Sequence, residues 1–162
     1  MRYLILLPFM FLVFTACQKT DREKLNGMWL ISEIRVNGEQ MFSTEKAEQQ
    51  KIIDRVINEQ MAQLPPEAQG QEAMMRNLFS RQMAISAKTT LEFKEDGTFV
   101  SIRYNGSSQV ETTGQITLDE AKKEIKMKSD SDEQFTYELK EELLKLSNYS
   151  DGEKIELSFR RK

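Results

Sequence analysis

From residue 88 to the end of the chain, apolar and polar positions alternate in short runs separated by turn residues. The last run is typical, because Ile155, Leu157 and Phe159 all fall on the same side of an extended chain. Alternation of this kind indicates β-strands with one buried face. It predicts seven strands here. With a further strand at residues 28–36, the total of about eight favours an antiparallel barrel or sandwich.

Pairs of Asn or Asp followed by Gly separate several of these runs, and both residue types tolerate the positive φ of tight hairpin turns. The pairs are Asn37-Gly38, Asp96-Gly97, Asn105-Gly106 and Asp151-Gly152. Residues 39–42 are predicted to form a short return strand after the first pair. Gly114 interrupts the longest predicted strand, at residues 109–118, and indicates a bulge or a bend.

Between residues 43 and 87 the apolar spacing changes to three or four, which is typical of amphipathic helices. Ser43 is placed to cap a first helix, and Pro65-Pro66 ends it and opens a second. The pattern predicts a hairpin of two helices, at residues 44–64 and 66–86, inserted into the β domain after its first strand. The apolar stripes of the two helices contain Ile53, Ile57, Met75, Phe79 and Met83.

These stripes must be buried, because each large apolar side chain gains about 1.5–3 kcal/mol by leaving water. We expect the helices to lie across one end of a barrel, with Ile53, Ile57, Met75, Phe79 and Met83 as a lid that faces a ligand. Their methionines suit either adaptable apolar binding or simple filling of gaps. The alternative is that the pair packs against the outside of the barrel and extends its core.

The beginning of the chain has a different pattern. Arg2 precedes an almost unbroken apolar run at residues 3–14, which ends at Thr15 and Ala16, directly before Cys17. This order is typical of an export signal, and the run is shorter than the ~20 residues of a membrane-spanning helix. We predict a cleaved signal at residues 1–16, a polar tether at 17–24 and one domain at 25–162.

The four residues Phe14, Thr15, Ala16 and Cys17 resemble the lipobox of bacterial lipoproteins. The resemblance implies that Cys17 carries acyl chains such as palmitate. It also implies that the protein is attached to the outer membrane, on the periplasmic face or the cell surface, since two or more chains anchor stably. The alternative is an ordinary secretory signal cut near Cys17. Cys17 is the sole cysteine, so an intramolecular disulfide is excluded.

Composition argues against several classes of function. The chain has 26 acidic and 23 basic residues, with a net charge of −3, which makes nucleic acid a poor partner. It has no histidine, the commonest general base and metal ligand. No phosphate loop, dinucleotide fingerprint or nucleophile motif occurs. Residues 130–133 lack the full spacing of a calcium loop. We therefore expect no catalytic residues, metal or cofactor.

Three motifs carry a second resemblance. Residues 25–29 (LNGMW) resemble the Gly-x-Trp opening of lipocalins, residues 91–99 a hairpin with Asp-Gly-Thr at its turn, and residues 157–161 a last strand with a basic end. In these features the chain resembles the lipocalin-like lipoproteins of Bacteroidota. The resemblance implies a lipocalin-like barrel of about eight strands. The predicted two-helix insertion departs from it, because it is far longer than the lipocalin loop at that place. The insertion is more similar to the helical lid of fatty-acid-binding proteins.

In lipocalins the tryptophan closes the base of the barrel, and a basic residue of the last strand packs across it. Side chains alternate along a strand, so Arg161 shares the side of Phe159 and Arg160 points away. The resemblance therefore implies a base formed by Gly27, Trp29 and Arg161, held by stacking and a cation–π contact. The alternative is a simple core tryptophan with both arginines in solvent.

The family resemblance implies non-catalytic binding of a hydrophobic or amphiphilic small molecule. The alternative is an envelope protein-interaction module, such as an inhibitor or an accessory subunit, in which side chains fill the barrel. No motif indicates a particular protein partner. The interior of the barrel distinguishes the two, since a cavity of a few hundred Å³ favours a ligand and a solid core favours a partner.

Overall fold

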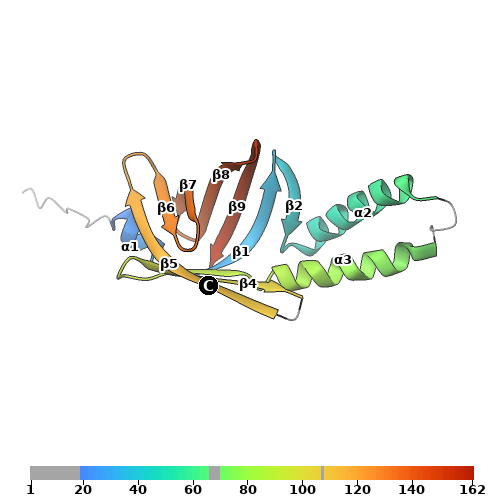
Figure 1. The fold of residues 1–162 in the computed structure, drawn as a ribbon, viewed down its shortest axis with the longest axis horizontal. Coiled ribbons are helices and arrows are strands. Elements are labelled where there is room, and N and C mark those ends of the chain that lie inside the picture. Colours follow the sequence, from blue (N-terminus) through green and yellow to red (C-terminus); the bar gives the residue numbers. More distant parts are fainter. Residues whose placement is uncertain (1–18, 66–69, 107) are drawn as a thin grey trace, which may run out of the picture.

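The computed structural model of the protein describes residues 19–65, 70–106 and 108–162, which form a closed antiparallel barrel with three helices (Figure 1). The helices are α1 (Asp21–Leu25), α2 (Lys46–Gln63) and α3 (Glu72–Ser86). The strands are β1 (Gly27–Val36), β2 (Glu39–Ser43), β3 (Thr90–Phe93), β4 (Thr98–Asn105), β5 (Ser108–Asp119), β6 (Glu124–Lys128), β7 (Asp132–Lys140), β8 (Leu143–Ser150) and β9 (Glu153–Arg161).

The barrel is closed by β1. Strands β3 to β9 pair antiparallel in chain order, and β1 pairs with β3 on one side and with β9 on the other. These eight strands form the ring, and β2 extends the sheet beside the second half of β1. The predicted eight-stranded antiparallel barrel with a two-helix insertion is confirmed, and the insertion follows the short return strand β2.

Both ends of the helical insertion are held by neighbouring residues of β1. The backbone N–H of Ile31 donates to the carbonyl of Thr89 (3.0 Å), and the N–H of Thr44 donates to the carbonyl of Ser32 (2.9 Å). The register of β1 against β9 shifts between Ile31 and Glu33, which places Ser32 in a bulge at this point. The helix pair therefore leaves and re-enters the wall at one place and projects away from the barrel (Figure 1).

The helices begin later than the sequence pattern predicts. Ser43 is the last residue of β2, where it pairs with Glu33 of β1 and is buried. It therefore belongs to the sheet. Its Oγ accepts the backbone N–H of Glu45 at 3.1 Å, one residue before α2 begins at Lys46. The second helix begins at Glu72, whereas the predicted start at residue 66 lies outside the described residues.

The end of the predicted tether forms a helix. Thr20 caps α1 through its Oγ1, which accepts the N–H of Glu23 (3.2 Å), while the Glu23 carboxylate accepts the N–H of Thr20 (2.8 Å). This reciprocal capping box satisfies backbone donors at the start of the helix. The prediction of a polar tether at 17–24 is therefore corrected from Thr20 onward.

Helix α1 is fixed to one end of the barrel by Asp21. The Asp21 carboxylate accepts hydrogen bonds from Lys123 Nζ (2.5 Å) and from the Tyr137 hydroxyl (2.8 Å). The bond from Lys123 is the main cause that lowers the pKa of Asp21. Burial, followed by the neighbouring Asp21 carboxylate, raises the pKa of Tyr137. Leu25 follows, with its side chain fully buried.

The sequence pattern predicts a bulge or a bend at Gly114. This residue lies in continuous register opposite Phe99, so the β4–β5 pair has no bulge at this position. Glycine is required here because the backbones approach closely. A Cβ at Gly114 would lie 2.1 Å from the carbonyl oxygen of Lys128 and 2.6 Å from the ring of Phe99.

The hydrophobic core extends from the end of the barrel that α1 covers to the buried faces of the helix pair. Its largest fully buried side chains are Trp29, Phe93, Leu25, Ile57, Ile125, Leu144 and Leu146, of which Ile57 belongs to α2. Across the three described ranges, no helix has the length and apolar character needed to cross a membrane.

Candidate ligand cavity

Three residues meet at the closed base of the barrel. Trp29 of β1 lies opposite Arg161 of β9, and the Arg161 guanidinium stands 4.3 Å from the centre of the Trp29 ring. Arg161 also donates to the carbonyl of Asn26 (2.9 Å) and to that of Lys24. Gly27 has φ +118°, and a Cβ there would lie 3.1 Å from the guanidinium. Glycine therefore permits both the backbone conformation and the stacked arginine.

Arg160 lies on the other side of β9. Its guanidinium forms an ion pair with Glu45 (3.1 Å), and both side chains are more than half exposed. The structure thus places Arg161, and not Arg160, against the tryptophan. Gly27, Trp29 and Arg161, the base residues that the lipocalin resemblance implies, lie together.

Above this base the barrel contains a cavity of about 490 Å³. Inward-facing side chains of the ring strands, the β6–β7 turn and the end of α3 line it. The apolar lining residues are Ile31, Ile34, Leu91, Phe99, Met127, Phe135, Leu146, Leu157 and Phe159. The polar ones are Ser86, Thr89, Ser101, Arg103, Tyr104, Thr112, Ser129, Asp130, Ser131 and Glu133.

The mouth of the cavity carries charges of both signs. Asp130 and Glu133 come from the turn between β6 and β7 and from the start of β7, and both are exposed. Arg103 and Tyr104 come from the end of β4, where the Nζ of Lys88 stands 5.9 Å from the centre of the Tyr104 ring. The cavity therefore joins an apolar interior to a polar opening.

Sequence reasoning did not single out the polar residues of β4 and β5 in this cavity. Alternation is the signal that could have found them. Phe99 points inward, so Ser101 and Arg103 share its side, and Thr112 lies opposite Ser101 in the β4–β5 ladder. A polar inward position in a barrel strand is a departure from core packing, and it marks a lining surface.

The five residues of the predicted lid lie elsewhere. Ile53, Ile57 and Met83 are buried, Met75 and Phe79 are half-buried, and all five belong to or pack against the hydrophobic core. None of the five lines the cavity, which α3 reaches only through Ser86 at its end. The stripes are covered because α2 and α3 pack against each other and against β2 and β4.

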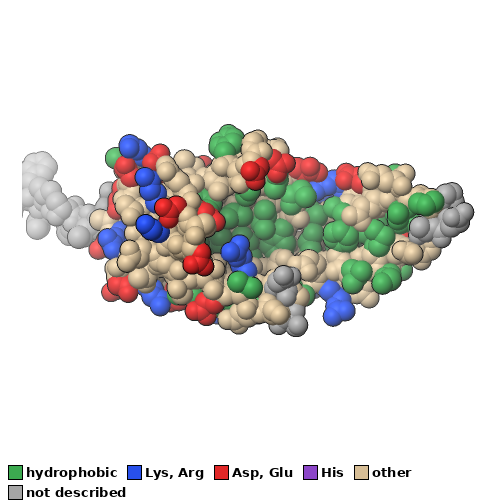
Figure 2. All heavy atoms as spheres, viewed as in Figure 1, with side chains coloured by type: hydrophobic (Ala, Val, Ile, Leu, Met, Phe, Trp, Pro, Cys, Tyr) green, Lys and Arg blue, Asp and Glu red, His purple; other side chains and the backbone are tan. Residues whose placement is uncertain are grey.

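Part of the helix pair leaves apolar surface uncovered. Met74 and Leu78, one turn apart on α3, are 65% and 53% exposed. In Figure 2 hydrophobic side chains form a band that runs from the barrel onto the helices. The projecting helix pair is thus a second candidate binding surface, in addition to the cavity.

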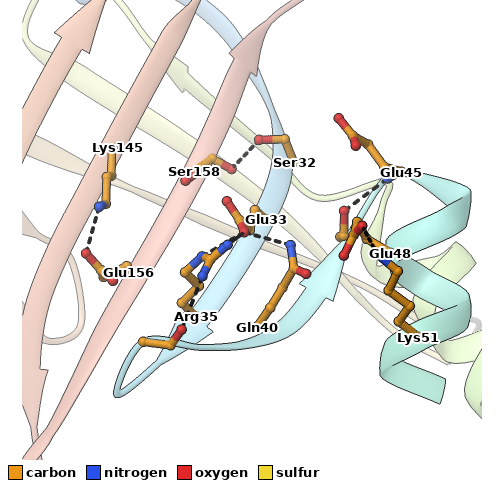
Figure 3. Close-up of polar contacts among 12 residues, drawn as sticks. Ser32, Glu33, Arg35, Gln40, Glu45, Glu48, Lys51, Lys145, Glu156 and Ser158 are labelled. Atoms are coloured by element: carbon orange, nitrogen blue, oxygen red, sulfur yellow. Dashed lines mark hydrogen bonds and ion pairs between the residues drawn. The ribbon is translucent and has the colours of Figure 1, made fainter. Parts of the chain in front are cut away.

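A smaller hollow of about 300 Å³ lies on the outside of the barrel, between β2, the start of α2 and β9. Several of its side chains already pair with one another or with neighbours (Figure 3). The Glu33 carboxylate accepts hydrogen bonds from Arg35 (2.8 Å) and Gln40 (2.7 Å), and the Ser32 hydroxyl donates to the carbonyl of Ser158 (3.0 Å). These contacts fix β1, β2 and β9 together.

An adjacent buried carboxylate on β9 is paired in the same way. Glu156 is 8% exposed and forms ion pairs with Lys145 (2.7 Å) and Lys154 (3.0 Å), one of which is drawn in Figure 3. The hydrogen bond from Lys145, followed by that from Lys154, lowers the pKa of Glu156. Within the described part of the chain, no three Asp, Glu, Cys or His side chains are grouped so that they could hold a metal ion.

Comparison with known proteins supports the fold. The structure is similar to the crystal structure of a DUF4847 family protein from Bacteroides vulgatus, with a TM-score of 0.50 and 14% sequence identity. The similarity covers 85% of this chain and 94% of the other. No protein-family model matches the sequence, and no curated protein matches it. At this identity the similarity shows the fold alone.

Proposed function

We propose that this protein binds an amphiphilic small molecule in the barrel cavity and performs no chemistry on it. The cavity carries this proposal. Its volume of about 490 Å³ lies within the range of ~300–1,000 Å³ that is typical of ligand sites. Its lining combines nine aliphatic, aromatic and thioether side chains with ten that carry hydroxyl or charged groups, which suits a ligand that is partly apolar and partly polar.

We also propose that the protein is a lipocalin-like lipoprotein, attached to the outer membrane through acyl chains on Cys17. Residues 1–18, which include Cys17, lie outside the described residues, so this part rests on the lipobox resemblance of residues 14–17. The arrangement of the barrel is compatible with it. Helix α1, the first described helix, covers the closed base, so the mouth lies at the opposite end of the barrel from α1.

Replacement of Cys17 with serine tests the anchor. We expect C17S to abolish metabolic labelling with palmitate and to release the protein from the membrane fraction, because serine has no thiol to receive the lipid. Immunoblotting of membrane and soluble fractions, beside autoradiography, measures both effects. Labelling and membrane attachment that persist in C17S would contradict the proposed anchor and leave the cavity proposal standing.

Obstruction of the cavity tests the binding function. Ser101 of β4 lines the cavity, whereas Thr113 of the neighbouring strand β5 points to the outside of the barrel and is exposed. We expect S101W to lose at least tenfold in affinity for anilinonaphthalene sulfonate, an aromatic and anionic fluorophore, because the indole occupies the binding volume. T113W, the matched control, should bind the fluorophore as the wild type does. Circular dichroism and thermal melts establish that each variant is folded.

The alternative function, an envelope protein-interaction module, has one observation in its favour. Met74 and Leu78 expose apolar surface on the projecting helix pair. This alternative predicts that the folded wild type takes up no fluorophore, or that S101W and T113W take it up equally. Either result would contradict the small-molecule proposal.

A further inference from the structure

We infer that the ligand is a facial amphiphile, a rigid ring compound with hydroxyl groups along one face, and not a chain with a single polar end. The inference rests on the proposed function and names its ligand class. It follows from the side chains around the cavity: β8, β9 and β1 contribute an apolar wall, whereas β4 and β5 contribute Ser101 and Thr112 beside the apolar Phe99.

One wall of the cavity is apolar. Ile34 of β1 lies opposite Leu157 of β9, and Leu157 lies opposite Leu146 of β8, so the three side chains form a continuous row across neighbouring strands. Phe135 of β7 and Phe159 of β9 extend this surface. All five residues line the cavity, and together they offer a broad apolar face.

The opposite wall carries hydroxyl groups. Ser101 of β4 lies opposite Leu91 of β3 on one side and Thr112 of β5 on the other. Thr89, just before β3, adds another hydroxyl. Ser101 and Thr112 are half-buried, which places them inside the barrel and not only at its rim. Arg103, two residues beyond Ser101, continues this wall to the mouth.

These hydroxyl groups are available to a ligand. Ser101 and Thr112 line the cavity, and their side-chain oxygens are not among the buried unpartnered ones of the described residues. A ligand that displaced water from them without offering polar atoms would leave them unsatisfied, which is unfavourable. An alkyl chain has no polar atoms along its length, so it would leave both hydroxyls unsatisfied.

A rigid ring system with hydroxyls on one face satisfies both walls at once. Its apolar face covers Ile34, Leu146 and Leu157, and its hydroxyls bond to Ser101 and Thr112. A rigid ligand also loses less conformational freedom on binding than a flexible chain. An acidic group at the end of the ring system would lie beside Arg103.

The test is a calorimetric titration of the full-length protein with two probes below their micellar concentrations. Cholate is a steroid carboxylate with hydroxyls on one face, and palmitate is a chain with one polar end. We expect cholate to bind more tightly than palmitate. Thr112→Val, which keeps the shape of the side chain and removes the hydroxyl, should weaken cholate about tenfold and leave palmitate unchanged.

Thr113→Val is the matched control, because Thr113 is the next residue of β5 and points outward. It should change the affinity for neither probe, and Ser101→Ala should repeat the selective loss for cholate. If palmitate binds more tightly and Thr112→Val affects neither probe, the facial inference is overturned while the binding function stands. If the folded wild type binds neither cholate, palmitate nor the naphthalene fluorophore, the inference and the proposed function both fail.

Discussion

Replacement of Trp29 with alanine is expected to lower the free energy of unfolding by about 3–5 kcal/mol, the usual cost of removing a large aromatic side chain from a core. Trp29 is fully buried, and its indole N–H donates to the carbonyl of Leu25 at 2.7 Å. Its ring also supports the Arg161 guanidinium at 4.3 Å. The substitution therefore removes packing, the link to α1 and the stacked cation together.

Chemical denaturation measures this effect, and the two adjacent arginines supply the control. Arg161→Ala should be clearly destabilising, because it leaves the carbonyls of Asn26 and Lys24 without their partner. Arg160→Ala should cost no more than about 1 kcal/mol, the usual limit for an exposed ion pair. A larger loss for Arg160→Ala than for Arg161→Ala would show that the base of the barrel is held in another way.

Replacement of Gly114 with alanine is expected to destabilise the barrel by about 3 kcal/mol, at the upper end of the usual cost of overpacking. The added methyl group would lie 2.1 Å from the carbonyl oxygen of Lys128, a backbone atom that no rotamer change can move. Strands β5 and β6 must separate to admit it, and their ladder is only five residue pairs long.

Gly70 provides the comparison for Gly114. Apart from Gly70 itself and its two chain neighbours, no atom of the described residues lies within 4 Å of a Cβ built at Gly70, and its φ is outside the left-handed region. Gly70→Ala should therefore leave the denaturation midpoint nearly unchanged. If Gly114→Ala also leaves the denaturation midpoint unchanged, then β5 and β6 can accommodate a methyl group, and the explanation for this glycine is wrong.

Much of the barrel was predictable because its strands follow simple alternation and Asn-Gly or Asp-Gly turns. The alternation of the last strand also indicated that Arg161 shares a side with Phe159, and the pairing of β9 with β1 places it over Trp29. Parity is reliable along this part of β9, since its register shows no shift there against β8.

Other features depend on information that local patterns do not contain. Helix α1 has five residues, too few for a periodic stripe, and only the spacing of Thr20 and Glu23 indicates it. The bulge at Ser32 changes the phase of β1, which allows both Ile31 and Ile34 to line the cavity. A cavity is also a volume left between many strands, so no single segment predicts its size.

The helix pair shows the same limit in another form. The apolar stripes of α2 and α3 correctly indicated burial of Ile53, Ile57 and Met83. Burial against the other helix and burial against a ligand gain similar free energy per unit area, so the pattern alone does not choose between them. The position of the helices depends instead on where the insertion is attached, because β1 holds its two ends side by side at Ile31 and Ser32.

The most direct test of the cavity as a ligand site is native mass spectrometry of the protein isolated from its own cells without denaturation. We expect the wild type to carry a small-molecule adduct that collisional activation releases and that the folded S101W variant lacks. The T113W control should retain the adduct. A folded wild type of unliganded mass that also takes up no naphthalene fluorophore would contradict the proposal that this barrel binds a small molecule.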